Sequence, residues 1–333
     1  MAAEASTVVA GTRGVYVFDT AIASNNLGDA IIMDAVWGVF HEIFGRDARP
    51  PRIATHTYMS RHTYGTLGDC ELAIVGGTNI LKSHMFVRAN WRLRPYDMFF
   101  IKNVVLLGVG WQQYQRRDTD VFSRLLFSRI LSRTFVHSVR DEYTLAKMHR
   151  QVKNIAYTAC PTLWPLNAAR CSKIPTTKAP AVIVSLTYYR PDPADTGLIE
   201  LLRNEYETVY FWCQQDSDRE YLAGLKVGTA LETIDDLDAY DRLLETGRVD
   251  VIGTRLHGGI RALQRGCRAL ILAVDNRALE LARSTGIPVV DRRDMDTIRG
   301  WIRASPQVSI TLPWEAIDAW KRQFAEMRPA ALG

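Results

Sequence analysis

Short apolar runs alternate with amphipathic segments along almost the whole chain. Runs such as Leu72–Val75 and Val249–Ile252 have the length and composition of buried strands. Between such runs lie segments with apolar residues at helical spacing, as in 27–44 at Ile31, Ile32, Ala35, Val36, Val39, Phe40 and Ile43. This strand–helix rhythm is typical of a mainly parallel sheet covered by helices. The pattern therefore predicts an α/β fold.

The same pattern divides the chain into two halves. The first predicts strands over 15–18, 72–75, 103–109, 135–139 and 154–157, with helices over 27–44, 121–131 and 142–148. The second predicts strands over 181–186, 208–212, 249–252, 269–274 and 288–290, with helices over 198–206, 236–246, 257–265, 279–284 and 313–327. We expect two doubly wound, Rossmann-like domains with a cleft between them, and ligands beside the carboxyl ends of strands.

Length and composition fit this division and exclude other classes. The 333 residues suit two domains at 1–165 and 181–310, with a linker over 166–180 and a C-terminal helix within 311–333. Four prolines in 161–180 favour the linker. An apolar fraction of 47% and a charged fraction of 23% argue against disorder. The net charge of +5 is spread without a basic tract, so nucleic acid is not an expected partner.

The pattern holds no sign of a membrane-spanning or exported segment. No apolar run reaches the roughly 20 residues of a membrane span, and the N-terminus lacks the pattern of a signal peptide. The five cysteines show no zinc-type spacing. We therefore expect a cytoplasmic protein with reduced thiols, no cofactor and no essential metal. Peripheral contact with the inner face of a membrane stays open.

The strongest chemical signal is the segment Val251–Ile260, which reads VIGTRLHGGI. A buried strand ends at Gly253 and a helix begins near His257, so the loop between them offers backbone N–H groups and the positive end of a helix dipole. Arg255 adds a forked cation suited to phosphate or carboxylate, and His257 can transfer a proton near neutral pH. The alternative is a tight turn with a surface arginine and a capping histidine.

Two other turns follow predicted strands. The segment SNNLGDA at 24–30 offers Asn26, Gly28 and Asp29 at the start of the first long helix. Ordinary helix capping is an equally good explanation of these residues. In the segment SVRDE, Arg140 follows a strand directly and either serves a ligand or forms a surface ion pair.

A further turn, GGTN at 76–79, also follows a buried strand. Its Gly77 would let a ligand approach the backbone closely, and Asn79 offers an amide. Lys82 and His84 lie shortly beyond it. The alternative is a plain turn with solvated charges behind it.

These four turns, taken in their order along the chain, resemble those of the polysaccharide pyruvyltransferase family. The likeness rests on the turn at Asn26–Asp29, the Gly-Gly turn, the S-x-R-D turn and the R-L-H-G turn, and spans roughly residues 15 to 290. The resemblance implies a GT-B-like pair of domains. It also implies transfer of the pyruvyl group of phosphoenolpyruvate to two hydroxyls of a sugar, which forms a pyruvate ketal and releases phosphate.

The resemblance also suggests roles for individual residues. It assigns Arg140, Arg255, His257 and Gly258 to phosphoenolpyruvate, with Arg255 and His257 taking part in catalysis. Asp29 is the candidate base for a sugar hydroxyl. Other residues are expected to line the acceptor side or the cleft: Asn26, Gly28, Gly77, Asn79, Lys82, His84 and Arg277. At 274–277 the chain reads VDNR where family members commonly have Tyr-Asp-x-Lys.

The expected partners are phosphoenolpyruvate and a sugar of a surface polysaccharide, an exopolysaccharide, a glycolipid or a lipid-linked precursor. Two alternatives remain open. A GT-B-type glycosyltransferase would hold the diphosphate of a nucleotide sugar at the Arg255 loop. A non-catalytic member would bind a sugar without releasing phosphate.

Overall fold

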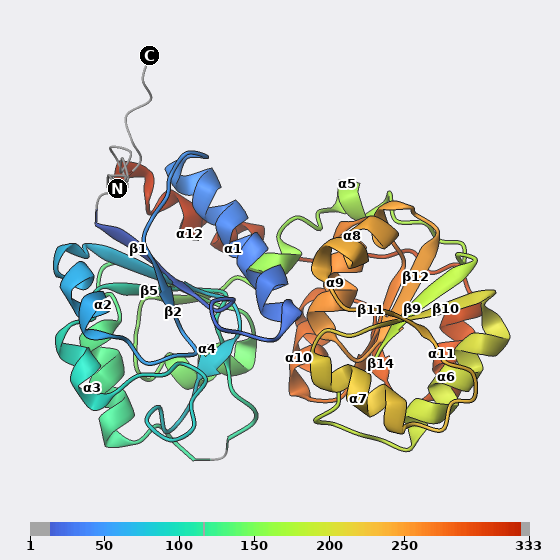
Figure 1. Cartoon of the computed structure of the whole chain (residues 1–333). Helices are drawn as coiled ribbons and strands as arrows, with labels where there is room; N and C mark the ends of the chain where they lie inside the picture. Colours follow the sequence, from blue (N-terminus) through green and yellow to red (C-terminus); the bar gives the residue numbers. More distant parts are fainter. Residues whose placement is uncertain (1–13, 116, 328–333) are drawn as a thin grey trace, which may run out of the picture. The chain divides into compact units, whose positions relative to one another are not determined.

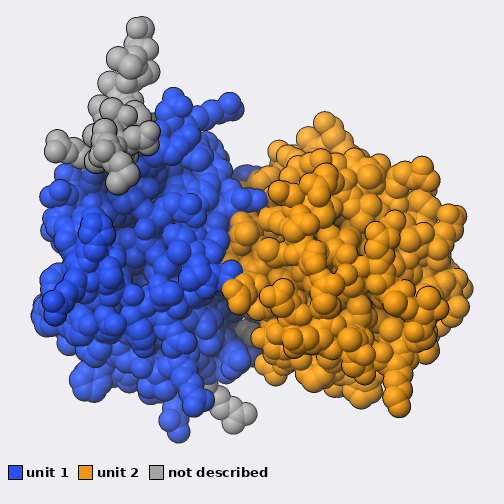
Figure 2. Space-filling view, in the orientation of Figure 1, with its two compact units in different colours: residues 1–24, 32–161, 313–333 blue, residues 25–31, 162–312 orange. Residues whose placement is uncertain are grey.

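The computed structural model describes residues 14–115 and 117–327. The chain forms two compact units, which are coloured separately in Figure 2. Unit 1 comprises Met1–Ser24, Ile32–Pro161 and Pro313–Gly333, and unit 2 comprises Asn25–Ile31 and Thr162–Leu312. The chain therefore passes between the units at four points, one of them inside helix α1 (Leu27–Phe44).

Unit 1 is built on a parallel sheet. Its four central strands are paired in the order β2 (Arg52–Ala54), β1 (Val15–Asp19), β3 (Leu72–Gly76) and β5 (Val104–Leu107). Two short parallel pairs accompany them: β4 (Asn79–Leu81) with β6 (Gly110–Trp111), and β7 (His137–Val139) with β8 (Ile155–Tyr157). A parallel bridge from Val109 to Val139 ties β7 to the end of the β5 segment.

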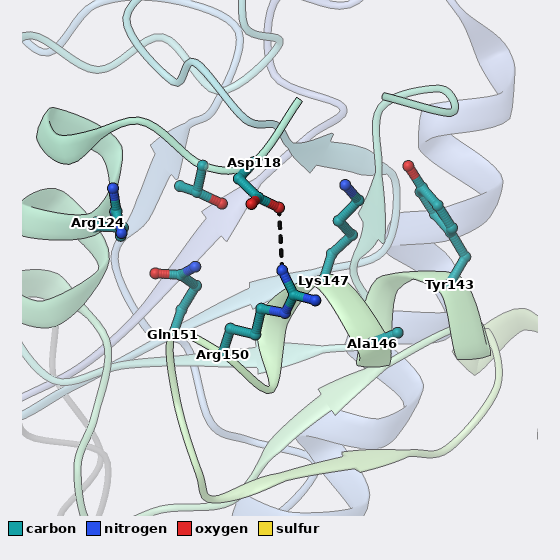
Figure 3. A pocket seen from close by; sticks show the side chains of 8 residues that line it. Asp118, Arg124, Tyr143, Ala146, Lys147, Arg150 and Gln151 are labelled. Carbon is teal, nitrogen blue, oxygen red and sulfur yellow. Dashed lines mark hydrogen bonds and ion pairs between the residues drawn. The ribbon is translucent and has the colours of Figure 1, made fainter. Parts of the chain in front are cut away.

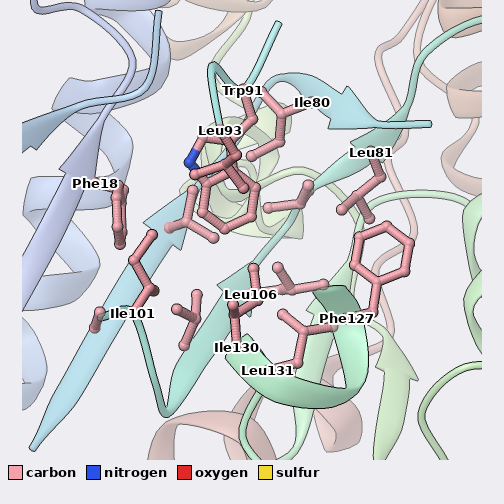
Figure 4. Close-up of a cluster of buried hydrophobic side chains, with 14 of the residues drawn as sticks. Phe18, Ile80, Leu81, Trp91, Leu93, Ile101, Leu106, Phe127, Ile130 and Leu131 are labelled. Atoms are coloured by element: carbon pink, nitrogen blue, oxygen red, sulfur yellow. The ribbon is translucent and has the colours of Figure 1, made fainter. Parts of the chain in front are cut away.

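Helices cover this sheet. They are α1, α2 (Arg61–Thr66), α3 (Val121–Ile130), α4 (Glu142–Met148) and α12 (Trp314–Arg322), with short 3-10 helices at η1 (Leu67–Asp69), η2 (Pro95–Phe99) and η4 (Ala325–Met327). Asp120 is the N-cap residue of α3 and Asp141 that of α4, and each aspartate accepts a hydrogen bond from the backbone N–H three residues on. The buried core between sheet and helices brings together Phe18, Trp91, Leu106 and Phe127 (Figure 4).

Unit 2 contains a six-stranded parallel sheet. Its order is β11 (Glu232–Ile234), β10 (Thr208–Trp212), β9 (Ala181–Ser185), β12 (Val249–Gly253), β13 (Ala269–Ala273) and β14 (Val289–Asp291). The order reverses between the neighbouring strands β9 and β12 (Figure 1). In doubly wound sheets such a switch point is where ligands bind, beyond the carboxyl ends of the strands.

The helices of unit 2 alternate with these strands. They are α6 (Ala194–Glu205), α7 (Asp216–Gly224), α8 (Leu237–Glu245), α9 (Leu256–Gln264), α10 (Asn276–Thr285) and α11 (Met295–Arg303). After η3 (Pro161–Leu163), the segment 166–180 that was predicted as a linker contains α5 (Ala168–Cys171) and buries Leu166, Cys171 and Ile174. All five cysteines are buried.

The α/β class with parallel sheets is confirmed, and α1, α4 and β10 have the predicted bounds. Elements without a long apolar run were missed, above all α7, β11 and α11. The helix predicted over 313–327 is α12 followed by η4, and it belongs to unit 1. Within the described residues, no helix is long and apolar enough to span a membrane.

Candidate functional site

The strongest sequence signal lies at the switch point of unit 2. β12 ends at Gly253, and α9 begins at Leu256 with Arg255 as its N-cap residue. The side chain of Arg255 accepts no hydrogen bond from the backbone of this helix. The N-terminus of α9 thus presents its dipole and backbone donors at the ligand-binding edge of the sheet.

Arg255 is held by a carboxylate that the sequence analysis did not find. Its Nε donates to Asp218 Oδ2 at 3.0 Å, and Nη2 donates to Oδ1 of the same carboxylate. Both side chains are buried. Asp218 also accepts from the backbone N–H groups of Tyr188 at 3.2 Å and Gln215 at 3.1 Å. The pair fixes one edge of the guanidinium in place and balances its charge.

Opposing effects act on the Asp218 carboxyl. Burial raises the pKa of Asp218 above its ordinary value, and the charge of Arg255 and its hydrogen bonds counteract that shift. The guanidinium also lies over the ring of Tyr189, 5.4 Å from its centroid. Tyr188 and Tyr189 follow β9, so both strands of the switch point contribute to the surroundings of Arg255.

His257 lies in the first turn of α9 and keeps 8% of its surface exposed. The next residue, Gly258, is packed rather than open. A Cβ there would stand 2.2 Å from Trp212 Cζ3. Trp212 is stacked on Tyr240 with 4.1 Å between ring centroids, and the Tyr240 hydroxyl donates to the Gly258 carbonyl at 3.0 Å. The glycine therefore lets the start of α9 rest on an aromatic pair.

The turn before α1 belongs to this same unit. Gln214, which follows β10, donates from Nε2 to Asn26 Oδ1 at 2.5 Å and accepts from the backbone N–H of Leu27 at 3.0 Å. A Cβ on Gly28 would lie 2.6 Å from Gln214 Nε2. Asp29 is buried in the first turn of α1. Asn26 and Gly28 thus seat the helix start against Gln214, another residue that the sequence analysis missed.

A separate group of predicted residues meets in unit 1. Arg140 follows β7 and is 4% exposed, with its Nε 3.4 Å from Asp141 Oδ2. A Cβ on Gly110 would stand 2.0 Å from Asn79 Oδ1 and 2.4 Å from Arg140 Nε. Gly110 therefore makes room for both side chains. Asn79 Oδ1 is buried and has no hydrogen-bond donor among the described residues, so it is available to a ligand or a water.

Other predicted residues of unit 1 have structural contacts. Gly77 has a positive φ of 63°, and a Cβ on it would collide with Ile32 of α1. Lys82 Nζ donates to the Val87 carbonyl at 2.8 Å, and burial lowers the pKa of this lysine. His84 Nδ1 lies 2.8 Å from Asp120 Oδ2 at the start of α3.

Arg277 lies in α10, and its side chain is outside the described part of the structure. In the ranges 14–115 and 117–327, no group of three His, Cys, Asp or Glu side chains is arranged to hold a metal ion. The predicted residues thus form two groups, one around Arg255 in unit 2 and one around Arg140 in unit 1.

The architecture has counterparts of known structure. UDP-GlcNAc 2-epimerase of Methanocaldococcus jannaschii, in complex with UDP-GlcNAc and UDP, is similar with a TM-score of 0.51 and 12% identity, over 93% of this chain and 97% of that one. A second structure of that epimerase is similar with a TM-score of 0.50 and 10% identity, over 90% and 94% of the two chains. The fold is therefore GT-B-like, as the resemblance implied.

Sequence comparison identifies the family. Residues 26–276 match the family described as polysaccharide pyruvyl transferase. The match covers most of the chain, so the protein belongs to this family, a family of transferases that act in polysaccharide pyruvylation. A search of curated proteins gave no significant match.

Proposed function

We propose that the protein transfers the pyruvyl group of phosphoenolpyruvate to two hydroxyls of one sugar, as a ketal, with release of phosphate. The family match over residues 26–276 carries this proposal. The acceptor is a sugar of a surface polysaccharide, or of its glycolipid or lipid-linked precursor. The reaction belongs in the cytoplasm, where phosphoenolpyruvate is made.

The loop between β12 and α9 is suited to the donor. Phosphoenolpyruvate carries a phosphate and a carboxylate, and the N-terminus of a helix is a ready site for such anions. Because Asp218 balances the charge of Arg255, the backbone donors of α9 and the edge of the guanidinium that does not face Asp218 would do most of the binding. The resemblance also assigns Arg140 to the donor, and the variant Arg140→Ala tests that assignment separately.

The chemistry needs a proton donor and a base. A proton delivered to the methylene carbon leaves an oxocarbenium-like C2, which one sugar hydroxyl attacks while giving up its proton. The second hydroxyl then attacks C2 as the bond from C2 to the phosphate oxygen breaks, its proton passes to the departing phosphate, and the ketal ring closes. His257, at the start of α9, is the proposed general acid or the partner of the departing phosphate. Asp29 is the proposed base for a sugar hydroxyl.

The alternative function is a glycosyl transfer from a nucleotide sugar. It has one supporting observation, the likeness of fold to an epimerase solved with UDP-GlcNAc and UDP. In that case the start of α9 would bind the diphosphate of the nucleotide.

A thermal-shift titration with phosphoenolpyruvate, phosphate and UDP separates the two functions. A ligand present at about 100 times its Kd stabilises the folded state by about 2.7 kcal/mol, which raises the midpoint measurably. We expect phosphoenolpyruvate to raise it, and His257→Asn to weaken that effect. His149→Asn is the matched control, because His149 is exposed. A rise with UDP alone would contradict the proposal and favour the alternative.

A further inference from the structure

Helix α3 turns several apolar side chains toward solvent. Val121, Phe122 and Leu125 keep 67%, 70% and 41% of their surface exposed, whereas the opposite side of the helix is buried in the core of unit 1. With 3.6 residues per turn, Val121, Leu125 and Arg129 follow one line along the helix, and Arg124 borders that line. The sequence of α3 contains no acidic residue. Its exposed side is therefore apolar and cationic.

The neighbouring helix η2 also exposes large apolar side chains. It packs against α3, and Phe99 is 73% exposed, with Tyr96 and the following Phe100 each 46% exposed. The one carboxylate of η2, Asp97, is buried, whereas Lys102 shortly beyond is exposed. Two adjoining elements thus expose large apolar side chains beside cations. Clusters of exposed apolar side chains are typical of surfaces that contact another protein or a membrane.

A cationic pocket adjoins the exposed side of α3, because Arg124 lines it. The pocket has a volume of about 440 Å³ and is lined by α4 and the residues just after it, by Arg124 of α3 and by the loop before α3 (Figure 3). Arg124, Lys147 and Arg150 place three cations around it, against the single carboxylate of Asp118. Asp118 pairs with Arg150 at 3.2 Å. This excess of positive charge, with two guanidinium groups, suits a phosphate group.

We propose that this face of unit 1, formed by the exposed side chains of α3 and η2 and by the adjoining pocket, docks on a bilayer that contains anionic phospholipid. The aromatic and aliphatic side chains enter the interfacial layer, and the cations of the pocket hold a lipid phosphate. The inference goes beyond the proposed reaction and does not depend on it, because docking needs neither donor nor acceptor.

Charge distinguishes a bilayer from a second copy of the chain as the occupant. A symmetric dimer through this face would bring Arg124 and Arg129 of one copy against the same cationic surface of the other. An anionic bilayer neutralises these charges and receives the apolar side chains between them. The face is therefore complementary to anionic lipid and not to itself.

Sedimentation of the full chain with vesicles tests the proposal. The vesicles contain phosphatidylcholine alone, or phosphatidylcholine with about 30% phosphatidylglycerol. One variant combines Val121→Ser, Phe122→Ser and Leu125→Ser, and another combines Lys147→Glu and Arg150→Glu. The matched control combines Leu279→Ser and Lys173→Glu, which change an exposed apolar residue and an exposed cation of unit 2.

We expect the wild type to bind the anionic vesicles about ten-fold or more tightly than the neutral ones. The serine variant should lose about ten-fold on both kinds, because it no longer has the inserting side chains. The glutamate variant should lose only the preference for anionic vesicles. The control should bind like the wild type, and unchanged unfolding midpoints would show that the variants fold.

Three results would overturn the proposal. The first is a wild type that does not sediment with either kind of vesicle, and the second is a serine variant that binds as well as the wild type. The third is a dimer that the serine variant abolishes, without any vesicle binding, which would assign the face to a second copy. None of these outcomes depends on pyruvyl transfer, so the result stands even if the proposed reaction fails.

Discussion

Because Arg255 is paired with Asp218, a mutation at Arg255 affects the stability of the protein as well as the candidate site. Removing one partner of a buried ion pair leaves the other charge without compensation, which typically costs about 3–5 kcal/mol. We expect Arg255→Ala to lower the free energy of unfolding by about this amount, because Asp218 is fully buried. Urea denaturation at neutral pH measures the loss.

The double variant Arg255→Met with Asp218→Leu provides the control for this prediction. It removes both charges and fills their space, so most of the lost stability should return. If the double variant is stable but inactive, the loss of activity belongs to the site and not to unfolding. Equal stability of Arg255→Ala and the wild type would contradict the strong coupling that the bidentate contact implies.

His137 should make unit 1 sensitive to acid. Its side chain is fully buried, Nδ1 accepts from the backbone N–H of Leu106 at 3.2 Å, and Nε2 donates to the Ser132 carbonyl at 2.9 Å. The Nδ1 contact requires the neutral ring, and burial lowers the pKa of His137 to about 4. In the unfolded chain the ring protonates near pH 6.5. Its contribution to stability is therefore complete above about pH 6.5 and is lost as the pH falls to about 4.

The difference between the two pKa values corresponds to about 3 kcal/mol. Unfolding free energies measured from pH 7 to pH 4 should fall more steeply for the wild type than for His137→Gln, which cannot titrate. His149→Gln, at an exposed position, should follow the wild type. Parallel curves for the wild type and His137→Gln would show that His137 is not the group responsible.

At the scale of elements, the start of α9 depends on a glycine that faces an aromatic pair. A methyl group at 258 would meet Trp212, which is fully buried and stacked on Tyr240 and so has little room to move. We expect Gly258→Ala to cost about 1–3 kcal/mol and to displace the first turn of α9, which weakens binding of phosphoenolpyruvate. Denaturation and the ligand-induced thermal shift report the two effects.

Gly300 in α11 offers the comparison, because a Cβ there would meet no described atom within 4 Å. Gly300→Ala should therefore stabilise the protein by up to about 1 kcal/mol, through helix propensity alone. Should Gly258→Ala also be stabilising, Trp212 would have moved aside and the packing argument would be wrong.

The sequence was informative where an element has a continuous apolar face. α1 repeats apolar residues at helical spacing over five turns, and β10 is a compact apolar run, so both were predicted with the correct bounds. α7 reads DSDREYLAG and has few apolar residues, so its sequence shows no helical periodicity of apolar positions. Asp218, on α7, was missed for that reason.

The site was predictable only in part, for a related physical reason. Arg255 and His257 lie in a strand–helix turn with a recognisable pattern, so they could be identified from the local sequence. The partners Asp218 and Gln214 are brought in by strand order, which places β10 beside β9. Pairing across a sheet leaves no mark in the local sequence, so these contacts required the structure.

At the scale of the whole molecule, the segment just after α12 packs against other parts of unit 1 that are distant in the sequence. Phe324, just after α12, is fully buried, with ring centroids 5.9 Å from Phe44 and 5.3 Å from Phe135. We expect Phe324→Ala to destabilise unit 1 by about 3–5 kcal/mol, because it leaves a cavity. Amide hydrogen exchange should then quicken in α1 and β7, with little change in the strands of unit 2.

Trp314→Ala, at the start of the same helix, is the matched control, because Trp314 is 39% exposed. It should leave exchange in α1 almost unchanged. Faster exchange spread evenly over both units of the Phe324→Ala variant would contradict a role confined to unit 1.

The four points at which the chain passes between the units also limit how recombination can change such a protein during evolution. Unit 2 includes residues 25–31, and Asn26 within that segment is bound to Gln214. A single crossover after Pro161 would therefore separate unit 2 from part of its own fold and join α1 to a foreign partner. A single recombination event therefore cannot exchange either unit as an intact domain. We expect new specificities in this lineage to arise by substitutions in the loops at the strand ends, with both halves inherited together.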